Sequence, residues 1–147
     1  MKATLLHVRR LALIAALLGV VVAPRAASAQ SELDASEATA FLGSWSVSFQ
    51  ADFGAIEFPL ELTDQDGKVA AEVGLPDFTG AGPGAPVAVT DLSRSGEGLV
   101  LNYEFDAQGQ MVPVSLTLTP DGDDLAAVFD FAGGAFSLSG TAKRASD

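Results

Sequence analysis

The segment "IEFPLELTDQDGKVAAEV" (residues 56–73) decides the fold class, because it holds two runs of alternating hydrophobicity joined by an acidic turn. On each side of "TDQDG", apolar residues recur at every second position, which is the period of a strand with one buried face. An Asp-Gly pair between two such runs favours a tight hairpin. The segment therefore predicts two antiparallel strands, with Pro59 inside the first of them.

The same period of two continues on both sides of this hairpin, from Ser44 to about Lys143. Short segments dense in Gly, Asp or Pro separate the runs, among them "SRSGEG", "DAQGQ", "TPDGDD" and "FAGGA". Such spacing is typical of hairpins and hence of antiparallel neighbours. Eight runs of this kind favour an up-and-down barrel or a sandwich. We expect an all-β, eight-stranded antiparallel up-and-down barrel, since closure leaves no exposed edge.

A weak internal repeat accompanies the strand pattern. Pro113 lies 54 residues after Pro59, and apolar residues flank both prolines in the same way. The chain is thus expected to contain two pseudo-repeated halves of four strands each. A proline cannot donate to a neighbouring strand and is tolerated at edges or bulges. Each proline is therefore expected either at a bulge that curves its strand or at a gap in the barrel wall.

The first 29 residues have the pattern of a signal peptide. Basic residues precede the apolar run "LALIAALLGVVVA" (residues 11–23), and "ASA" (residues 27–29) offers the small residues that a signal peptidase needs. The apolar run is short for a membrane span and no second one follows, so membrane insertion is not expected. We expect an exported protein, periplasmic or extracellular after cleavage, whose mature chain begins at residue 30.

The expected mature chain consists of an arm with a short helical turn at residues 30–43, capped by Ser36, and a single barrel domain at residues 44–147. It contains no cysteine, four basic residues and nineteen acidic ones, which gives a net charge of −15. Such a charge repels nucleic acids and anionic lipid headgroups, so neither is expected as a partner.

Residues with the chemistry of catalysis are scarce. The single histidine, His7, lies in the signal peptide, and no cysteine is present. The acidic residues fall on outward strand positions, in turns or in the arm, where solvated carboxylates are more common than catalytic pairs. "DQDG" and "DGDD" lack the further ligands of a calcium loop and fit hairpin turns. We expect a protein that is not an enzyme, with no catalytic residue, metal site or cofactor.

The aromatic residues are the remaining candidates for function, and most of them, Phe136 included, fall on the expected inward face. They could fill the core completely, because eight-stranded barrels are narrow. They could also line a pocket for an apolar ligand. The loop "GLPDFTGAGPGAP" (residues 74–86) could serve as a lid over that pocket or as a spacer. The candidate ligand-binding residues are Trp45, Phe49, Phe58, Phe78, Tyr103, Phe105, Phe129 and Phe131.

The segment "FLGSWSV" (residues 41–47) resembles the opening of the lipocalin and calycin families, through Gly43 and Trp45. The mature chain also looks like small exported lipocalin-like barrels of bacteria. The resemblance implies that Trp45 closes one barrel end and that the interior holds a small apolar molecule, lipid- or retinoid-like. Exported bacterial metalloprotease inhibitors share this opening, with an N-terminal trunk that enters the protease. The alternative is therefore a protein-interaction or inhibitor-like module that acts through the arm "QSELDASE" or through its acidic surface.

Overall fold

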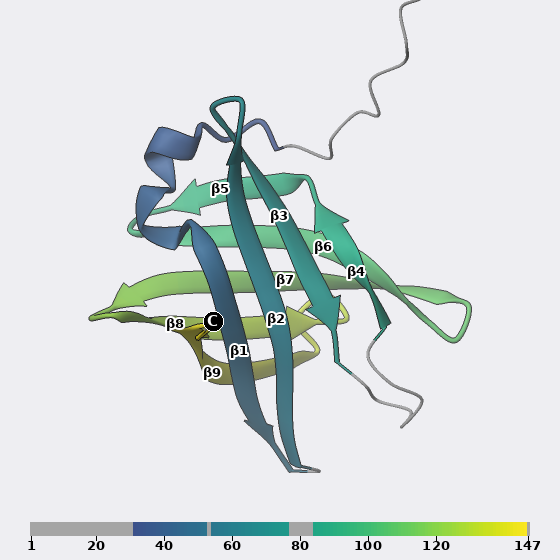
Figure 1. The fold of residues 1–147 in the computed structure, drawn as a ribbon. Coiled ribbons are helices and arrows are strands. Elements are labelled where there is room, and N and C mark those ends of the chain that lie inside the picture. Colours follow the sequence, from purple (N-terminus) through teal and green to yellow (C-terminus); the bar gives the residue numbers. More distant parts are fainter. Residues whose placement is uncertain (1–30, 53, 77–83, 147) are drawn as a thin grey trace, which may run out of the picture.

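The computed structural model describes residues 31–52, 54–76 and 84–146, and Phe78 lies outside them. Two short 3-10 turns precede nine strands (Figure 1). The turns are η1 (Ala35–Glu37) and η2 (Thr39–Phe41). The strands are β1 (Gly43–Ala51), β2 (Gly54–Gln65), β3 (Lys68–Leu75), β4 (Gly84–Val89), β5 (Asp91–Ser95), β6 (Gly98–Ala107), β7 (Gln110–Asp121), β8 (Asp124–Phe131) and β9 (Phe136–Arg144).

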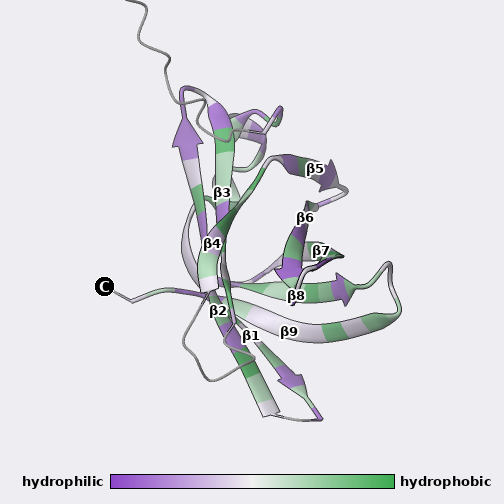
Figure 2. Cartoon of the chain, turned by 90° about the vertical axis from the view of Figure 1, so that its right-hand side faces the viewer, coloured by the Kyte–Doolittle hydropathy of each residue, from purple (hydrophilic) through white to green (hydrophobic). Residues whose placement is uncertain are grey.

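All nine strands belong to one antiparallel sheet, which confirms the expected all-β class. The order across the sheet is β4-β3-β2-β1-β9-β8-β7-β6-β5. Each strand pairs with its neighbour in the chain except at β4 and β5, and the first strand pairs with the last. In Figure 1 the sheet bends so that β1 to β4 cross in front of β5 to β9. Figure 2 shows hydrophilic and hydrophobic segments alternating along the strands, as the period of two requires.

The expectation of eight strands in a closed barrel is wrong. The sheet has a ninth strand, β5, and its two edge strands do not pair. The sequence does not indicate this extra strand, because Leu92 is its only buried residue and a single apolar position has no period. The sheet has two edges, β4 and β5, which follow one another directly through Thr90 but share no ladder. Strong curvature nevertheless brings Cα atoms of β4 and β6 within 8 Å of each other.

The acidic turns are hairpins, as the sequence indicates. Between β2 and β3, Asp66 and Gly67 both have positive φ, as a two-residue hairpin turn of this hand requires. The carboxylate of Asp64 accepts a hydrogen bond from the backbone N–H of Gly67 at 2.8 Å. Asp106 and Gly109 repeat this contact between β6 and β7. The acidic residues of these turns therefore fix backbone geometry.

Both prolines lie inside strands, in matching places. The ladder between β2 and β3 begins at Leu60, one residue after Pro59. The ladder between β7 and β8 begins at Val114, one residue after Pro113. Each proline thus stands where pairing with the next strand ends, a place at which no N–H has to be donated on that side. The strands can be divided into two series, β1 to β4 and β6 to β9, with β5 between them.

The N-terminal arm is bound to the sheet from Ser31 onward. The N–H of Ser31 donates to the carbonyl of Val69 at 2.9 Å, and the N–H of Val69 donates to the carbonyl of Leu33 at 3.0 Å. Lys68 forms an ion pair with Asp34 at 2.9 Å. The expected helical turn is present as η1 and η2, but its N-cap is Asp34 and not Ser36, and the Asp34 side chain makes no capping hydrogen bond.

Candidate functional site

Trp45 of β1 is buried at one end of the curled sheet and is only 2% exposed. Its indole Nε1 donates to the carbonyl of Phe41 at 2.7 Å, which ties the strand β1 to the turn η2. The guanidinium of Arg144 lies over the indole ring at 4.3 Å from the ring centroid and donates to the carbonyl of Leu42 at 3.1 Å. The guanidinium of Arg94 covers Phe41 in the same way at 5.1 Å. Two cations on aromatic faces therefore cover this end of the core.

The inner faces next to Trp45 are packed with aliphatic side chains. Val47, Leu99, Leu101, Leu116 and Leu118 are fully buried, with no exposed surface. Side chains from both series of strands contribute to this cluster. In this half of the molecule the buried side chains form one contiguous apolar cluster.

The other end of the sheet carries a chain of phenylalanines whose rings lie close to one another, which we call the aromatic path: Phe49, Phe58, Phe129, Phe131 and Phe136. The ring centroids of Phe49 and Phe129 lie 5.5 Å apart, those of Phe129 and Phe131 6.1 Å, and those of Phe131 and Phe136 5.4 Å. These separations are those of favourable aromatic pairs. The path joins strands from both series, β1 and β2 with β8 and β9.

Exposure increases steadily along the aromatic path. Phe49 is 1% exposed and Phe58 3%, Phe129 and Phe131 are half-buried, and Phe136 is 62% exposed. The path therefore leads from the core to the surface without a polar interruption between its rings. An exposed phenylalanine backed by four others is an apolar patch that continues into the core, which is typical of binding surfaces.

The strand register explains why these rings meet. Phe131 and Phe136 are direct partners across the β8–β9 hairpin. Phe49 lies opposite Gly140 of β9, and its ring occupies the space where a side chain of Gly140 would be: an added Cβ would approach the ring to 2.5 Å. The missing side chain at residue 140 thus allows the ring of Phe49 to lie against the backbone of β9.

The structure divides the predicted ligand-binding residues among different places. Phe49, Phe58, Phe129 and Phe131 come together in the aromatic path. Trp45 does not join them, because four residues of strand, roughly 13 Å, separate it from Phe49. Phe105 is half-buried against the core, Tyr103 lines a separate cavity, and Phe78 lies outside the described residues.

Phe136 was absent from the predicted ligand set and was expected to face inward, yet it is largely exposed. Strand periodicity places Phe136 on the inner face. It cannot show that β9 begins outside the part of the sheet whose inner face is covered by other side chains. Its closeness to the glycine-rich turn "FAGGA" is the one signal in the sequence that marks a strand end. Met111, at the β6–β7 hairpin, is the other large apolar residue with high exposure among those described, at 56%.

The cavity that Tyr103 helps to line measures about 570 Å³ and is formed by residues of β4, β5, β6, β7 and β8 and by the glycines of the β8–β9 turn. Burial raises the pKa of the Tyr103 hydroxyl above its ordinary value of 10.0. The cause is the loss of hydration of the phenolate within the protein.

Tyr103 should make folding stability depend on alkaline pH. Since its pKa is raised in the folded state, its contribution is complete below about pH 10 and is lost as the pH rises beyond that value, where only the unfolded chain ionises. Tyr103→Phe should lose this dependence, which amounts to about 1 kcal/mol at one pH unit above the unfolded pKa. Urea unfolding between about pH 8 and pH 11 measures it. An equal loss of stability between about pH 8 and pH 11 in the parent protein and in Tyr103→Phe would contradict the raised pKa of Tyr103.

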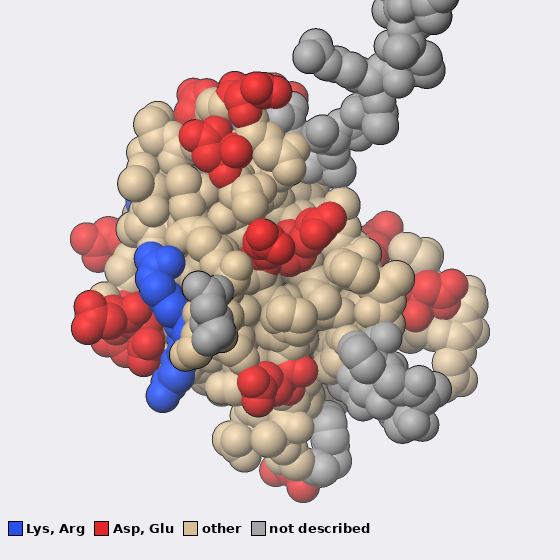
Figure 3. Space-filling view, in the orientation of Figure 1, with Lys and Arg blue, Asp and Glu red and all other residues tan. Residues whose placement is uncertain are grey.

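The acidic residues form no buried site in the described part of the chain. Within residues 31–52, 54–76 and 84–146, every Asp and Glu is exposed or half-buried. The same residues hold no cluster of three or more His, Cys, Asp or Glu side chains suited to a metal ion. In Figure 3, acidic side chains are spread over the visible face, whereas the cationic ones gather in one place.

None of the helical segments in the described residues has the length and apolar character to span a membrane. A scan against protein-family models gave no match for this chain, and neither did searches of curated proteins and of solved structures.

Proposed function

We propose that the protein is an exported, non-enzymatic binding protein that holds a small apolar molecule at the open end of its sheet. The observation that carries this proposal is the aromatic path, in which neighbouring phenylalanine rings lead from a buried core to the 62% exposed Phe136. On a chain with a large negative net charge, such a patch is costly to leave in water unless it is used. A ligand that covers Phe131 and Phe136 would extend this chain of apolar contacts outward.

The proposal includes the lipocalin-like arrangement that Gly43 and Trp45 suggest. In this view β4 and β5 act as one strand bent at Thr90, so that eight strands surround the interior and Trp45 closes one end. The ligand would be held near the mouth and not deep inside, because fully buried aliphatic side chains occupy the half next to Trp45.

The charges around the mouth restrict the chemistry of the ligand. Asp130 lies on β8 between Phe129 and Phe131, on the opposite face of the strand, and is half-buried. A carboxylate placed there, together with the net charge of the chain, disfavours an anionic ligand such as a fatty acid. The best candidates are lipid- or retinoid-like molecules with a neutral headgroup.

Phe136→Ser should weaken the binding of an apolar probe with no loss of stability. With the neutral dye N-phenyl-1-naphthylamine, we expect saturable fluorescence enhancement and an increase in Kd of about threefold to tenfold in the variant, since aromatic contacts are worth about 0.5–1.5 kcal/mol. Met111→Ser is the matched control, because it removes an equally exposed apolar side chain outside the path. Equal weakening by both variants, or no dye binding at all, would contradict the proposal.

A protein-interaction module is the second candidate. Its inhibitor-like form requires a free N-terminal trunk, but the arm is hydrogen-bonded to β3 from Ser31 onward, and Ala35 and Ala38 are buried. These contacts favour a partner bound through the acidic surface over one bound through the arm.

A further inference from the structure

Two Asp-Gly pairs occur in the chain, Asp66-Gly67 and Asp121-Gly122. An aspartate followed by glycine can rearrange without an enzyme, because the glycine has no side chain to hinder attack of its nitrogen on the aspartate side chain. All four residues are exposed, one pair in the β2–β3 turn and the other where β7 leads into the β7–β8 turn. The two pairs differ in what holds the glycine nitrogen.

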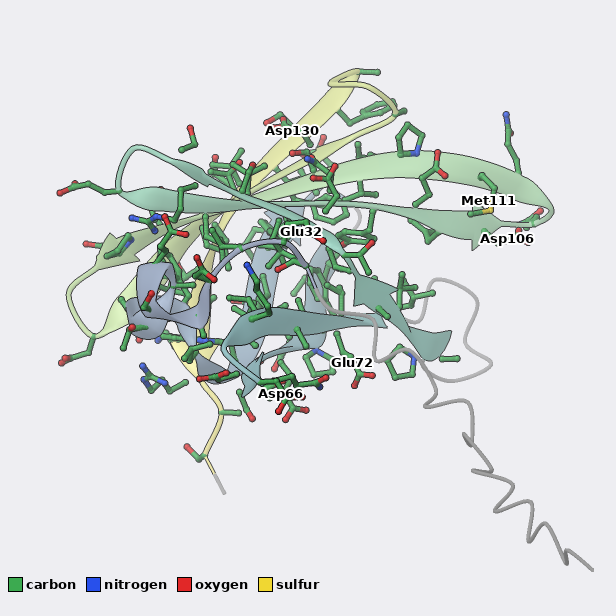
Figure 4. The ribbon with its side chains drawn as sticks, turned by 90° about the horizontal axis from the view of Figure 1, so that it is seen from above. Glu32, Asp66, Glu72, Asp106, Met111 and Asp130 are labelled. Carbon is green, nitrogen blue, oxygen red and sulfur yellow. The ribbon has the colours of Figure 1, made fainter. Side chains whose placement is uncertain are left out.

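In the β2–β3 turn the glycine nitrogen is held by a hydrogen bond. Asp64 lies just before the turn, and its carboxylate accepts from the N–H of Gly67 at 2.8 Å. An N–H that donates to a carboxylate loses its proton less readily, and this bond must break before the nitrogen can attack. The β6–β7 turn has the same contact, from Gly109 to Asp106, at the tip of the long hairpin in Figure 4. The pair Asp66-Gly67 is therefore protected by the carboxylate that precedes it.

The β7–β8 turn lacks this protection. Its last ladder pair is Asp121 with Asp124, so Pro120 occupies the position that the carboxylate holds in the other two turns. A proline side chain offers no acceptor. No described residue accepts a hydrogen bond from the N–H of Gly122, and none donates to the Asp121 carboxylate. A Cβ added to Gly122 would meet no atom within 4 Å, so the space beside this residue is open.

We propose that Asp121-Gly122 is a site of spontaneous modification, at which Asp121 becomes isoaspartate as the protein ages. The nitrogen of Gly122 attacks Cγ of Asp121, a C–N bond forms, and the proton of the nitrogen leaves with the carboxyl hydroxyl as water. The resulting succinimide takes up water at either ring carbonyl. Opening at the backbone carbonyl leaves the chain connected through the side chain, which is isoaspartate, and opening at the side-chain carbonyl restores aspartate. The rearrangement needs no oxidant or cofactor, and the product has the same atoms as the starting chain.

Isomerisation changes the end of the molecule at which Trp45 lies. Isoaspartate lengthens the main chain by one carbon atom, so the last ladder pair, Asp121 with Asp124, can no longer keep its register. The turn lines a cavity of about 660 Å³ together with Trp45 and Arg144. Because Trp45 is the single tryptophan of the chain, its fluorescence reports a change at this turn. The site is distinct from the aromatic path and does not depend on the proposed function.

The test incubates the purified protein for several weeks at raised temperature and mildly acidic pH, because a protonated carboxyl loses water more readily. Digestion with an aspartate-specific protease, which does not cleave at isoaspartate, followed by mass spectrometry locates the modified residue. We expect isoaspartate to form at Asp121 about threefold to tenfold faster than at Asp66, the factor that one hydrogen bond is worth. A change in the emission of Trp45 should accompany it.

Two variants and a denatured sample separate the effect of the fold from that of the local sequence. Asp121→Glu keeps the charge but would need a larger ring, so no isomer should form there. Asp64→Ala removes the protecting carboxylate, and the rate at Asp66 should rise by about threefold to tenfold while the rate at Asp121 stays unchanged. In urea the two Asp-Gly pairs should react at similar rates, and circular dichroism confirms the fold of each variant in buffer.

Three results would overturn the proposal. The first is a folded parent protein in which no isoaspartate forms at Asp121, or in which it forms equally fast at Asp66. The second is an Asp64→Ala variant in which the rate at Asp66 does not rise. The third is a difference between the two pairs that persists in urea, since the fold would then not be its cause.

Discussion

Trp45→Ala is expected to lower the free energy of unfolding by about 3–5 kcal/mol, the cost of removing a large aromatic side chain from a packed core. The indole is 2% exposed, its Nε1 donates to the carbonyl of Phe41 at 2.7 Å, and Arg144 lies over its ring at 4.3 Å. The substitution leaves a cavity and also removes the contacts of Trp45 with β1's preceding turn and with Arg144. Urea denaturation at neutral pH, followed by far-ultraviolet circular dichroism, measures the loss.

Phe136→Ala is the matched control for Trp45→Ala, since it removes an aromatic side chain that is 62% exposed. Its effect on unfolding should stay within about 1 kcal/mol. A loss below about 1 kcal/mol for Trp45→Ala itself would mean that the indole does not close the core. That result would contradict the lipocalin-like closure by Trp45 that we propose.

Gly140→Ala is expected to destabilise the fold by about 2–3 kcal/mol, because the added methyl group has no space and overpacking of a core is costly. The new Cβ would come within 2.1 Å of the carbonyl oxygen of Ser48 and 2.5 Å of the Phe49 ring. Since the oxygen belongs to the backbone, the strands β1 and β9 must separate. Chemical denaturation measures the loss, and Ser139→Ala, at an exposed neighbouring position, should change stability by less than about 0.5 kcal/mol.

Gly140→Ala also connects the fold with the proposed site. Displacement of Phe49 should disturb the inner end of the aromatic path, where the Phe49 and Phe129 centroids lie 5.5 Å apart. Binding of N-phenyl-1-naphthylamine should therefore weaken in this variant while Ser139→Ala binds as the parent does. A Gly140→Ala protein as stable as the parent would show that β1 and β9 are not packed as closely as described.

The paired prolines illustrate how far a sequence pattern leads. The repeat predicted matching places for Pro59 and Pro113, and both lie in strands one residue before a ladder begins. Two explanations were open, a bulge in the strand or a gap in the wall. The structure has a third arrangement, in which pairing with the following strand ends at the proline. The sequence could not distinguish these, because a missing N–H shows only that a donor is not required there.

The sequence alone determined eight of the nine described strands, because alternation with a period of two has a direct cause in the pleat of the backbone. It also determined the hairpins, since turns such as Asp66-Gly67 need residues that accept positive φ. By contrast, only the tertiary structure decided where the sheet stays open and how the aromatic residues are divided. Periodicity gives the face of a strand on which Trp45, Tyr103 or Phe131 lies. It does not give the distance of the residue from the open end of the sheet, and therefore not its burial. The burial of each side chain and the pairing of the sheet edges depend on the register and curvature of strands far apart in the chain, such as β1 with β9 and β4 with β6. For that reason one predicted set of inward aromatics is divided among a buried tryptophan under Arg144, the aromatic path and the lining of a separate cavity.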